Sequence, residues 1–108
     1  MKLITAIVNK EDSRAVNSAL VEAGFVVTKL STTGGFLLAQ NVTMLIGTED
    51  EKVEQCIGII SEHSRQRKEM VPSGAGYGGI SPAEIHPLEV TVGGATVFVS
   101  PVERFEKL

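Results

Sequence analysis

Hydrophobic positions near the start of the chain alternate as in a strand, and both alternating sets are apolar. Leu3 and Ile7 belong to one set, and Ile4, Ala6 and Val8 belong to the other. A strand that is apolar on both sides needs cover on both sides. We expect helices to supply one cover. We predict that a neighbouring subunit supplies the other, because a chain of 108 residues has few elements left to do so.

A helical period follows over residues 13–23. Its apolar stripe consists of Ala15, Val16, Ala19, Leu20 and Ala23. That spacing predicts a helix with one face turned to the core. Asp12 or Ser13 is expected to cap its N-terminus by accepting a hydrogen bond from a free backbone N–H. Gly24 stands where a left-handed residue often ends a helix.

A second helix is predicted over residues 49–64. Its core stripe consists of Val53, Cys56, Ile57 and Ile60. These residues recur at the spacing of one helix face. Thr48 or Asp50 is expected to cap this helix, and acidic residues in its first turn suit the positive end of the helix dipole.

Short extended segments account for most of the remaining chain. They are residues 25–31, 36–39, 43–47, 88–92 and 95–99. A glycine-rich turn separates the first two segments, and Gly93–Gly94 predicts a hairpin between the last two. Residues 65–87 carry several glycines and prolines without any period, so we expect an irregular loop there, a feature that is often functional.

The order of these elements predicts an α+β fold. It reads βαββαβ with one extra C-terminal strand, which is the ferredoxin-like arrangement of helices on one face of an antiparallel sheet. No internal repeat or linker interrupts the chain, so we expect a single domain over residues 1–108.

Composition narrows the choice of partners and compartment. The net charge of −3 disfavours duplex nucleic acid, which needs clustered Lys and Arg, although backbone N–H groups can still hold a small anion. One cysteine, Cys56, allows no intrachain disulfide and suits a reducing compartment. The apolar run at residues 3–8 is too short to span a membrane. We therefore expect a cytoplasmic protein with no membrane or nucleic-acid partner.

Candidate catalytic and metal-binding groups are sparse. Gly74, Gly76 and Gly79 match the spacing of a dinucleotide-binding motif, but they fall in the long loop rather than between a strand and a helix. Cys56 and His63 are two helical turns apart, roughly 10 Å, which is too far for one metal ion. No arrangement of Ser, His and an acidic residue suggests a catalytic site, so we expect no catalysis, metal or cofactor.

The segment from Thr28 to Leu37 offers a different chemistry. Its threonine hydroxyls and Gly34–Gly35 backbone N–H groups can bind phosphate. A purine can stack on Phe36, and the Asn41 carboxamide can pair with an adenine edge. The alternative is a plain hairpin turn in which Phe36 belongs to the core. The residues alone leave both interpretations open.

These residues also carry a family resemblance. The sequence from Thr28 through Asn41, with Thr-Thr-Gly-Gly-Phe-Leu at residues 32–37, and Val-Gly-Gly-Ala-Thr-Val-Phe-Val at residues 92–99 resemble the PII-like cyclic-di-AMP receptor family. The resemblance extends over nearly the whole chain. It implies a homotrimer that binds cyclic di-AMP in the three clefts between adjacent subunits. Residues 32–40 would correspond to the short T-loop of the family, and residues 65–87 to its long B-loop.

The resemblance also assigns ligand-binding residues. They are Thr28, Gly35, Phe36, Leu37, Asn41, Gly47 and Phe98. Phe36 is expected to stack on an adenine, and Asn41 and Gly47 to contact base edges. The other residues would line the phosphate and sugar region, with Phe98 closing the pocket. Ligand binding would order the loops and control an unidentified downstream protein.

Two positions depart from the family pattern. Val26 and Leu38 stand where basic residues are often found. An aliphatic side chain cannot make the bidentate phosphate bonds of arginine. A PII-like sensor of another adenine nucleotide is therefore an alternative, and a ligand-free structural trimer or a small enzyme are weaker ones.

Overall fold

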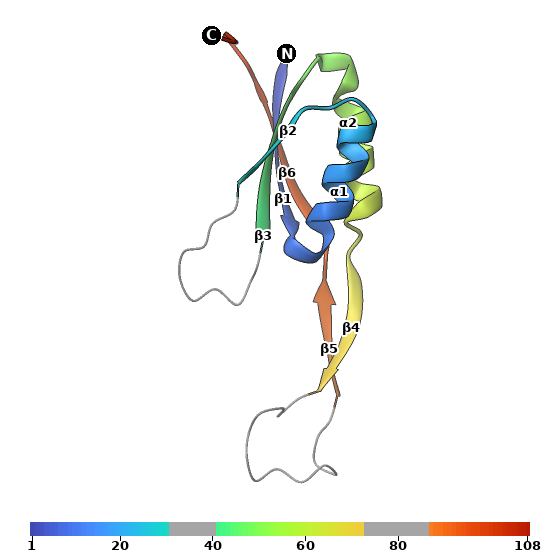
Figure 1. Ribbon diagram of the computed structural model, residues 1–108. Coiled ribbons are helices and arrows are strands. Elements are labelled where there is room, and N and C mark those ends of the chain that lie inside the picture. Colours follow the sequence, from blue (N-terminus) through green and yellow to red (C-terminus); the bar gives the residue numbers. More distant parts are fainter. Residues whose placement is uncertain (31–40, 73–86) are drawn as a thin grey trace.

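Two helices cover one face of a four-stranded antiparallel sheet in the computed structural model, which describes residues 1–30, 41–72 and 87–108 (Figure 1). The elements are β1 (Lys2–Asn9), α1 (Lys10–Glu22), β2 (Val27–Leu30), β3 (Asn41–Thr48), the 3-10 turn η1 (Asp50–Lys52), α2 (Val53–His63), β4 (Arg67–Pro72), β5 (Pro87–Val92) and β6 (Ala95–Pro101). The sheet order is β2-β3-β1-β6, and every neighbouring pair is antiparallel. This confirms the predicted α+β, ferredoxin-like and PII-like fold class. The predicted segment 36–39 lies outside the described residues.

The core lies between the sheet and the two helices. It contains Ile4, Ala6, Val8, Val16, Leu20, Phe25, Val42, Met44, Ile46, Cys56 and Ile60. One alternating set of β1 is thus fully buried, as its pattern predicted. The other set, Leu3 and Ile7, is only half-buried. The second side of the central strand therefore has little cover from the described residues.

Helix α1 begins earlier than predicted, and its cap is a different residue. The Asn9 side-chain oxygen accepts a hydrogen bond from the Glu11 N–H at 2.9 Å, so Asn9 is the N-cap. The proposed caps Asp12 and Ser13 are buried within the first turn instead. The prediction was wrong because Asn9 ends β1 with extended backbone, and this places its short carboxamide directly over the first helical turn.

The start of α2 also differs from the prediction. The chain makes η1 before the helix, and no side chain caps either element. Asp50, a proposed cap, pairs with the N-terminal ammonium group of Met1 at 2.9 Å, which holds the pKa of that carboxyl below its usual value. Thr48, the other proposed cap, is the buried last residue of β3. Three residues of the predicted core stripe are confirmed: Cys56 and Ile60 are fully buried, and Val53 packs against them. Ile57 lines a pocket instead, and Ile59 packs against the core in its place.

A two-stranded ribbon replaces part of the predicted irregular loop. Strands β4 and β5 pair from Arg67↔Val92 to Pro72↔Pro87 and extend away from the main sheet (Figure 1). The prediction of no regular structure over residues 65–87 was therefore wrong for Arg67–Pro72, and the predicted strand at residues 88–92 begins one residue earlier, at Pro87. Residues 73–86 lie outside the described residues.

The prediction of a hairpin turn at Gly93–Gly94 was wrong. The chain changes from one sheet to the other at this point. β5 before it pairs with β4, whereas β6 after it pairs with β1. Both glycines have positive φ, 80° and 84°, a conformation that costs L-residues energy. The Gly94 N–H donates to the Ser64 carbonyl, which joins this point to the end of α2.

A second contact fixes the base of the ribbon to the helical layer. Arg67 at the start of β4 lies 3.2 Å from the carboxylate of Asp12, whose side chain is only 10% exposed, and 3.6 Å from that of Glu11. Arg67 also donates to the Arg65 carbonyl. The ribbon is therefore held where it leaves the domain.

The two glycines allow a matched test of this junction. A Cβ at Gly93 would lie 2.6 Å from the Arg65 carbonyl oxygen and 2.7 Å from Arg67 Nη1, whereas the nearest atom to a Cβ at Gly94 is 3.7 Å away. Gly94→Ala should lower the free energy of unfolding by roughly 1–2 kcal/mol, the cost of positive φ alone. Gly93→Ala should lower the free energy of unfolding clearly more, because the Arg65 backbone must also move away from the new Cβ. Equal losses in urea unfolding would contradict the close packing at Gly93.

Candidate functional site

The face of the main sheet opposite the helices is uncovered in the part of the chain that the structure describes (Figure 1). We call it the open face. Paired residues in an antiparallel sheet share a face, and neighbours along a strand alternate. The open face therefore comprises Leu3, Thr5, Ile7, Asn9, Thr28, Leu30, Asn41, Thr43, Leu45, Gly47, Thr96, Phe98 and Ser100.

The side chains of this face are mainly aliphatic or threonine. One row crosses all four strands, from Thr28 through Leu45 and Thr5 to Phe98. Phe98 at the end of that row is 57% exposed. A surface of branched side chains, hydroxyls and one exposed ring is suited to contact with another protein chain or a ligand rather than with water alone.

All four predicted ligand-binding residues that the structure describes lie on the open face. They are Thr28, Asn41, Gly47 and Phe98. They do not meet in one pocket, however. Asn41 and Gly47 are at opposite ends of β3, roughly 20 Å apart, and Thr28 and Phe98 are on opposite edges of the sheet, roughly 14 Å apart. The remaining three, Gly35, Phe36 and Leu37, lie outside the described residues.

Gly47 has unusual surroundings for a strand glycine. No atom lies within 4 Å of the position that a Cβ would occupy, so nothing in the described fold requires glycine here. A glycine inside a strand costs stability and often marks a place where a ligand or another backbone approaches closely. Gly47 therefore leaves room on the open face for a ligand or for the backbone of another chain.

A polar pocket of about 440 Å³ opens where β1 ends, β3 begins and the ribbon leaves the sheet. We call it the junction pocket. Its lining residues are Ile7, Asn9, Asn41, Gln66, Gly93, Gly94, Ala95 and Thr96. Of these, only Asn41 was predicted as a site residue. Asn9 and Gln66 were missed because no sequence spacing links positions 9, 41 and 66. The strand register, which pairs Asn9 with Asn41, is what brings them together.

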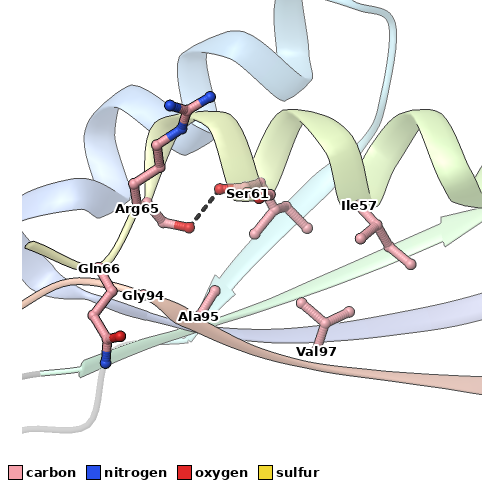
Figure 2. A pocket seen from close by; sticks show the side chains of 9 residues that line it. Ile57, Ser61, Arg65, Gln66, Gly94, Ala95 and Val97 are labelled. Carbon is pink, nitrogen blue, oxygen red and sulfur yellow. Dashed lines mark hydrogen bonds between the residues drawn. The ribbon is translucent and has the colours of Figure 1, made fainter.

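A second pocket, also of about 440 Å³, lies on the helical side of β6. Figure 2 shows Ile57 of α2 facing Ala95 and Val97 of β6 across it. The Arg65 side chain points away from these three apolar side chains, and the Gln66 side chain points away from Ile57 and Val97. Gln66, Gly94 and Ala95 line both pockets, so the two cavities lie on either side of the same short segment.

The described residues offer few groups for catalysis or metal binding. Cys56 is fully buried in the core, and burial raises the pKa of its thiol to about 11. No three His, Cys, Asp or Glu side chains among the described residues lie close enough to hold a metal ion. In the same ranges, neither helix has the length and apolar character needed to cross a bilayer.

The buried thiol should be chemically silent in the folded protein. Iodoacetamide at pH 8 should leave Cys56 unmodified over hours, because the thiol is fully covered and its pKa of about 11 keeps it protonated. Mass spectrometry should show one added group per chain only after unfolding. Fast labelling of the native protein would contradict the packing of α2 against the sheet.

Comparison with known proteins identifies relatives over the whole chain. A family model described as a cyclic-di-AMP receptor matches residues 1–108. The chain is also similar to the crystal structure of a functionally unknown protein from Pediococcus pentosaceus ATCC 25745, with 39% sequence identity and a TM-score of 0.74. That alignment covers 99% of this chain and 96% of the other.

Proposed function

Because the chain belongs to the cyclic-di-AMP receptor family, as its sequence resemblance predicted, we propose that it is a signal transduction protein that binds cyclic di-AMP at the clefts between subunits of a homotrimer. Membership of a receptor family agrees with a binding role rather than a catalytic one. In this proposal the protein acts in the cytoplasm, and ligand binding orders its loops to control a downstream protein.

The distribution of the predicted ligand residues on the open face is the observation that carries this proposal. Thr28 and Phe98 lie on opposite edges of one sheet, and Asn41 and Gly47 lie at opposite ends of one strand. One small ligand cannot touch all of them in a single chain. Packing a second copy against the open face would place an edge of one sheet beside an edge of the next. The ligand cleft would then be completed by two subunits.

The composition of the open face supports self-association. Leu3, Ile7 and Leu45 are only half-buried although they lie on central strands. Their burial would gain roughly 25 cal/mol per Å² of apolar surface removed from water. A subunit interface on this face would supply the second cover that the doubly apolar strand β1 requires.

The position of the predicted T-loop supports a ligand-controlled switch. Leu30 and Asn41 flank residues 31–40, and Asn41 lies in the junction pocket together with Gly93 and Gly94 at the base of the ribbon. A ligand bound at Asn41 would therefore lie beside both the T-loop and the segment that carries the B-loop. Its binding could bias the order of the two loops together.

Calorimetry with purified protein tests ligand identity. Cyclic di-AMP should bind near one molecule per subunit. Phe36→Ala should weaken binding roughly 5- to 150-fold, because stacking of a base on an aromatic ring is worth about 1–3 kcal/mol. Phe105→Ala, at a ring that is 66% exposed in the C-terminal tail, is the matched control and should bind as the wild type does.

ATP, AMP and cyclic di-GMP serve as competitors in the same assay. They test the second candidate, a sensor of another adenine nucleotide. That candidate is favoured by Val26, which is 79% exposed where the family often has a basic residue. Tighter binding of ATP or AMP than of cyclic di-AMP would show that the protein senses that nucleotide instead. An equal loss of affinity for cyclic di-AMP in Phe36→Ala and Phe105→Ala would contradict the assignment of Phe36 to the ligand site.

Sedimentation tests the assembly. The wild type should sediment as a trimer, and Leu45→Glu should shift it towards monomer, because it places an unpaired carboxylate at the centre of the open face. Val21→Glu introduces the same charge on an exposed position of α1 and should remain trimeric. A monomeric wild type, or a Leu45→Glu variant that stays trimeric, would contradict the use of the open face as the interface.

A further inference from the structure

We infer that Asn9 and Gln66 join Asn41 in the junction pocket to form a carboxamide site that reads the hydrogen-bonding edge of a purine-type base. The identity of the base as adenine rests on the proposed function. The site itself follows from the pocket, which gathers three carboxamides from three separate elements: the end of β1, the start of β3 and the segment before β4.

The junction pocket has the size and lining expected of a small polar ligand site. Its volume of about 440 Å³ falls in the usual range for small-molecule pockets, which is roughly 300–1,000 Å³. Besides the carboxamides it offers the Thr96 side chain and the backbone of Gly93 and Gly94. Its lining, as far as the described residues go, includes no Lys, Arg, Asp or Glu, so this part of it suits a neutral base better than a phosphate.

The carboxamide of Asn9 has a fixed direction. Its oxygen already accepts the Glu11 N–H at 2.9 Å as the cap of α1. The capping bond fixes the orientation of the carboxamide, so its nitrogen, which only donates, is directed away from the helix. Asn9 is therefore a preset donor for an acceptor nitrogen on a ring edge, and it needs no reorganisation on binding.

The other two carboxamides can both donate and accept. Asn41 is the direct cross-strand partner of Asn9, so the two side chains stand next to each other on the open face. Neither Asn41 nor Gln66 makes a side-chain hydrogen bond to any other described residue. Such free carboxamides can match the paired donor and acceptor of an adenine edge, as asparagine and glutamine do when they read adenine.

This site would also connect the ligand to the ribbon. Gln66 is the residue before β4, and its Cβ would lie 3.7 Å from a Cβ built at Gly94. A base held by Asn41 and Gln66 together would bridge the main sheet and the base of the ribbon. Recognition of the base and the position of the ribbon would then depend on the same contact.

Three variants separate recognition from folding. Asn9→Ser keeps a good helix cap but removes the carboxamide donor. Gln66→Glu replaces a donor with a carboxylate of the same shape. Gln55→Glu makes the same change at an exposed position of α2 outside both pockets and is the matched control. Equal melting temperatures of Asn9→Ser and the wild type would show that the cap survives.

The probes are cyclic di-AMP and its inosine analogue, cyclic di-IMP, which exchanges the donor and acceptor of the base edge. The wild type should prefer cyclic di-AMP. Asn9→Ser and Gln66→Glu should each bind it roughly 3- to 10-fold more weakly, the value of one net hydrogen bond, and should lose part of the preference over cyclic di-IMP. Gln55→Glu should behave as the wild type does.

The outcomes distinguish this inference from the proposed function. Wild-type binding of cyclic di-AMP with affinity and preference unchanged in both Asn9→Ser and Gln66→Glu would overturn the carboxamide site and leave the receptor function intact. Failure of the wild type to bind either dinucleotide would overturn the receptor function and, with it, the assignment of a purine to this pocket.

Discussion

Strand β1 organises both faces of the main sheet. It is apolar on both sides and pairs with β3 along its full length and with β6. The helices bury one side through Ile4, Ala6 and Val8. The other side remains open, and the same register that defines the core also aligns the residues of the open face. Core packing, the half-buried apolar side chains of the open face and the arrangement of the predicted ligand residues therefore all follow from one central strand.

Much of this fold could be predicted from the sequence, because periodicity reports burial directly. The apolar stripes at Val16 and Leu20 and at Cys56 and Ile60 identified both helices and their core faces. Helix starts were harder, since several polar residues competed for each cap and only the backbone direction selects Asn9. The pairing of β4 with β5 was missed, because Gly93–Gly94 is a hairpin signal and favoured pairing of residues 88–92 with residues 95–99 instead.

The candidate site shows the same division. Thr28, Asn41, Gly47 and Phe98 were predicted by resemblance, and the register places all four on one face. Asn9 and Gln66 carry no local signal, and only the fold brings them to the junction pocket. Residues that act through tertiary proximity are invisible to spacing rules, whereas residues in a contiguous motif are not. In this protein the pocket joins both kinds of residue around Asn41.

A mixing experiment tests most directly whether two copies complete each ligand cleft. Thr28→Glu and Phe98→Ala alter opposite edges of the sheet, and each homotrimer should bind cyclic di-AMP poorly. If one copy supplies Thr28 and its neighbour supplies Phe98, refolding the two variants together should restore about a quarter of the clefts, those that receive both native residues. Calorimetry should then detect about a quarter of the wild-type number of binding sites. No recovery in mixed trimers would contradict shared clefts, because each cleft would then draw both residues from one chain.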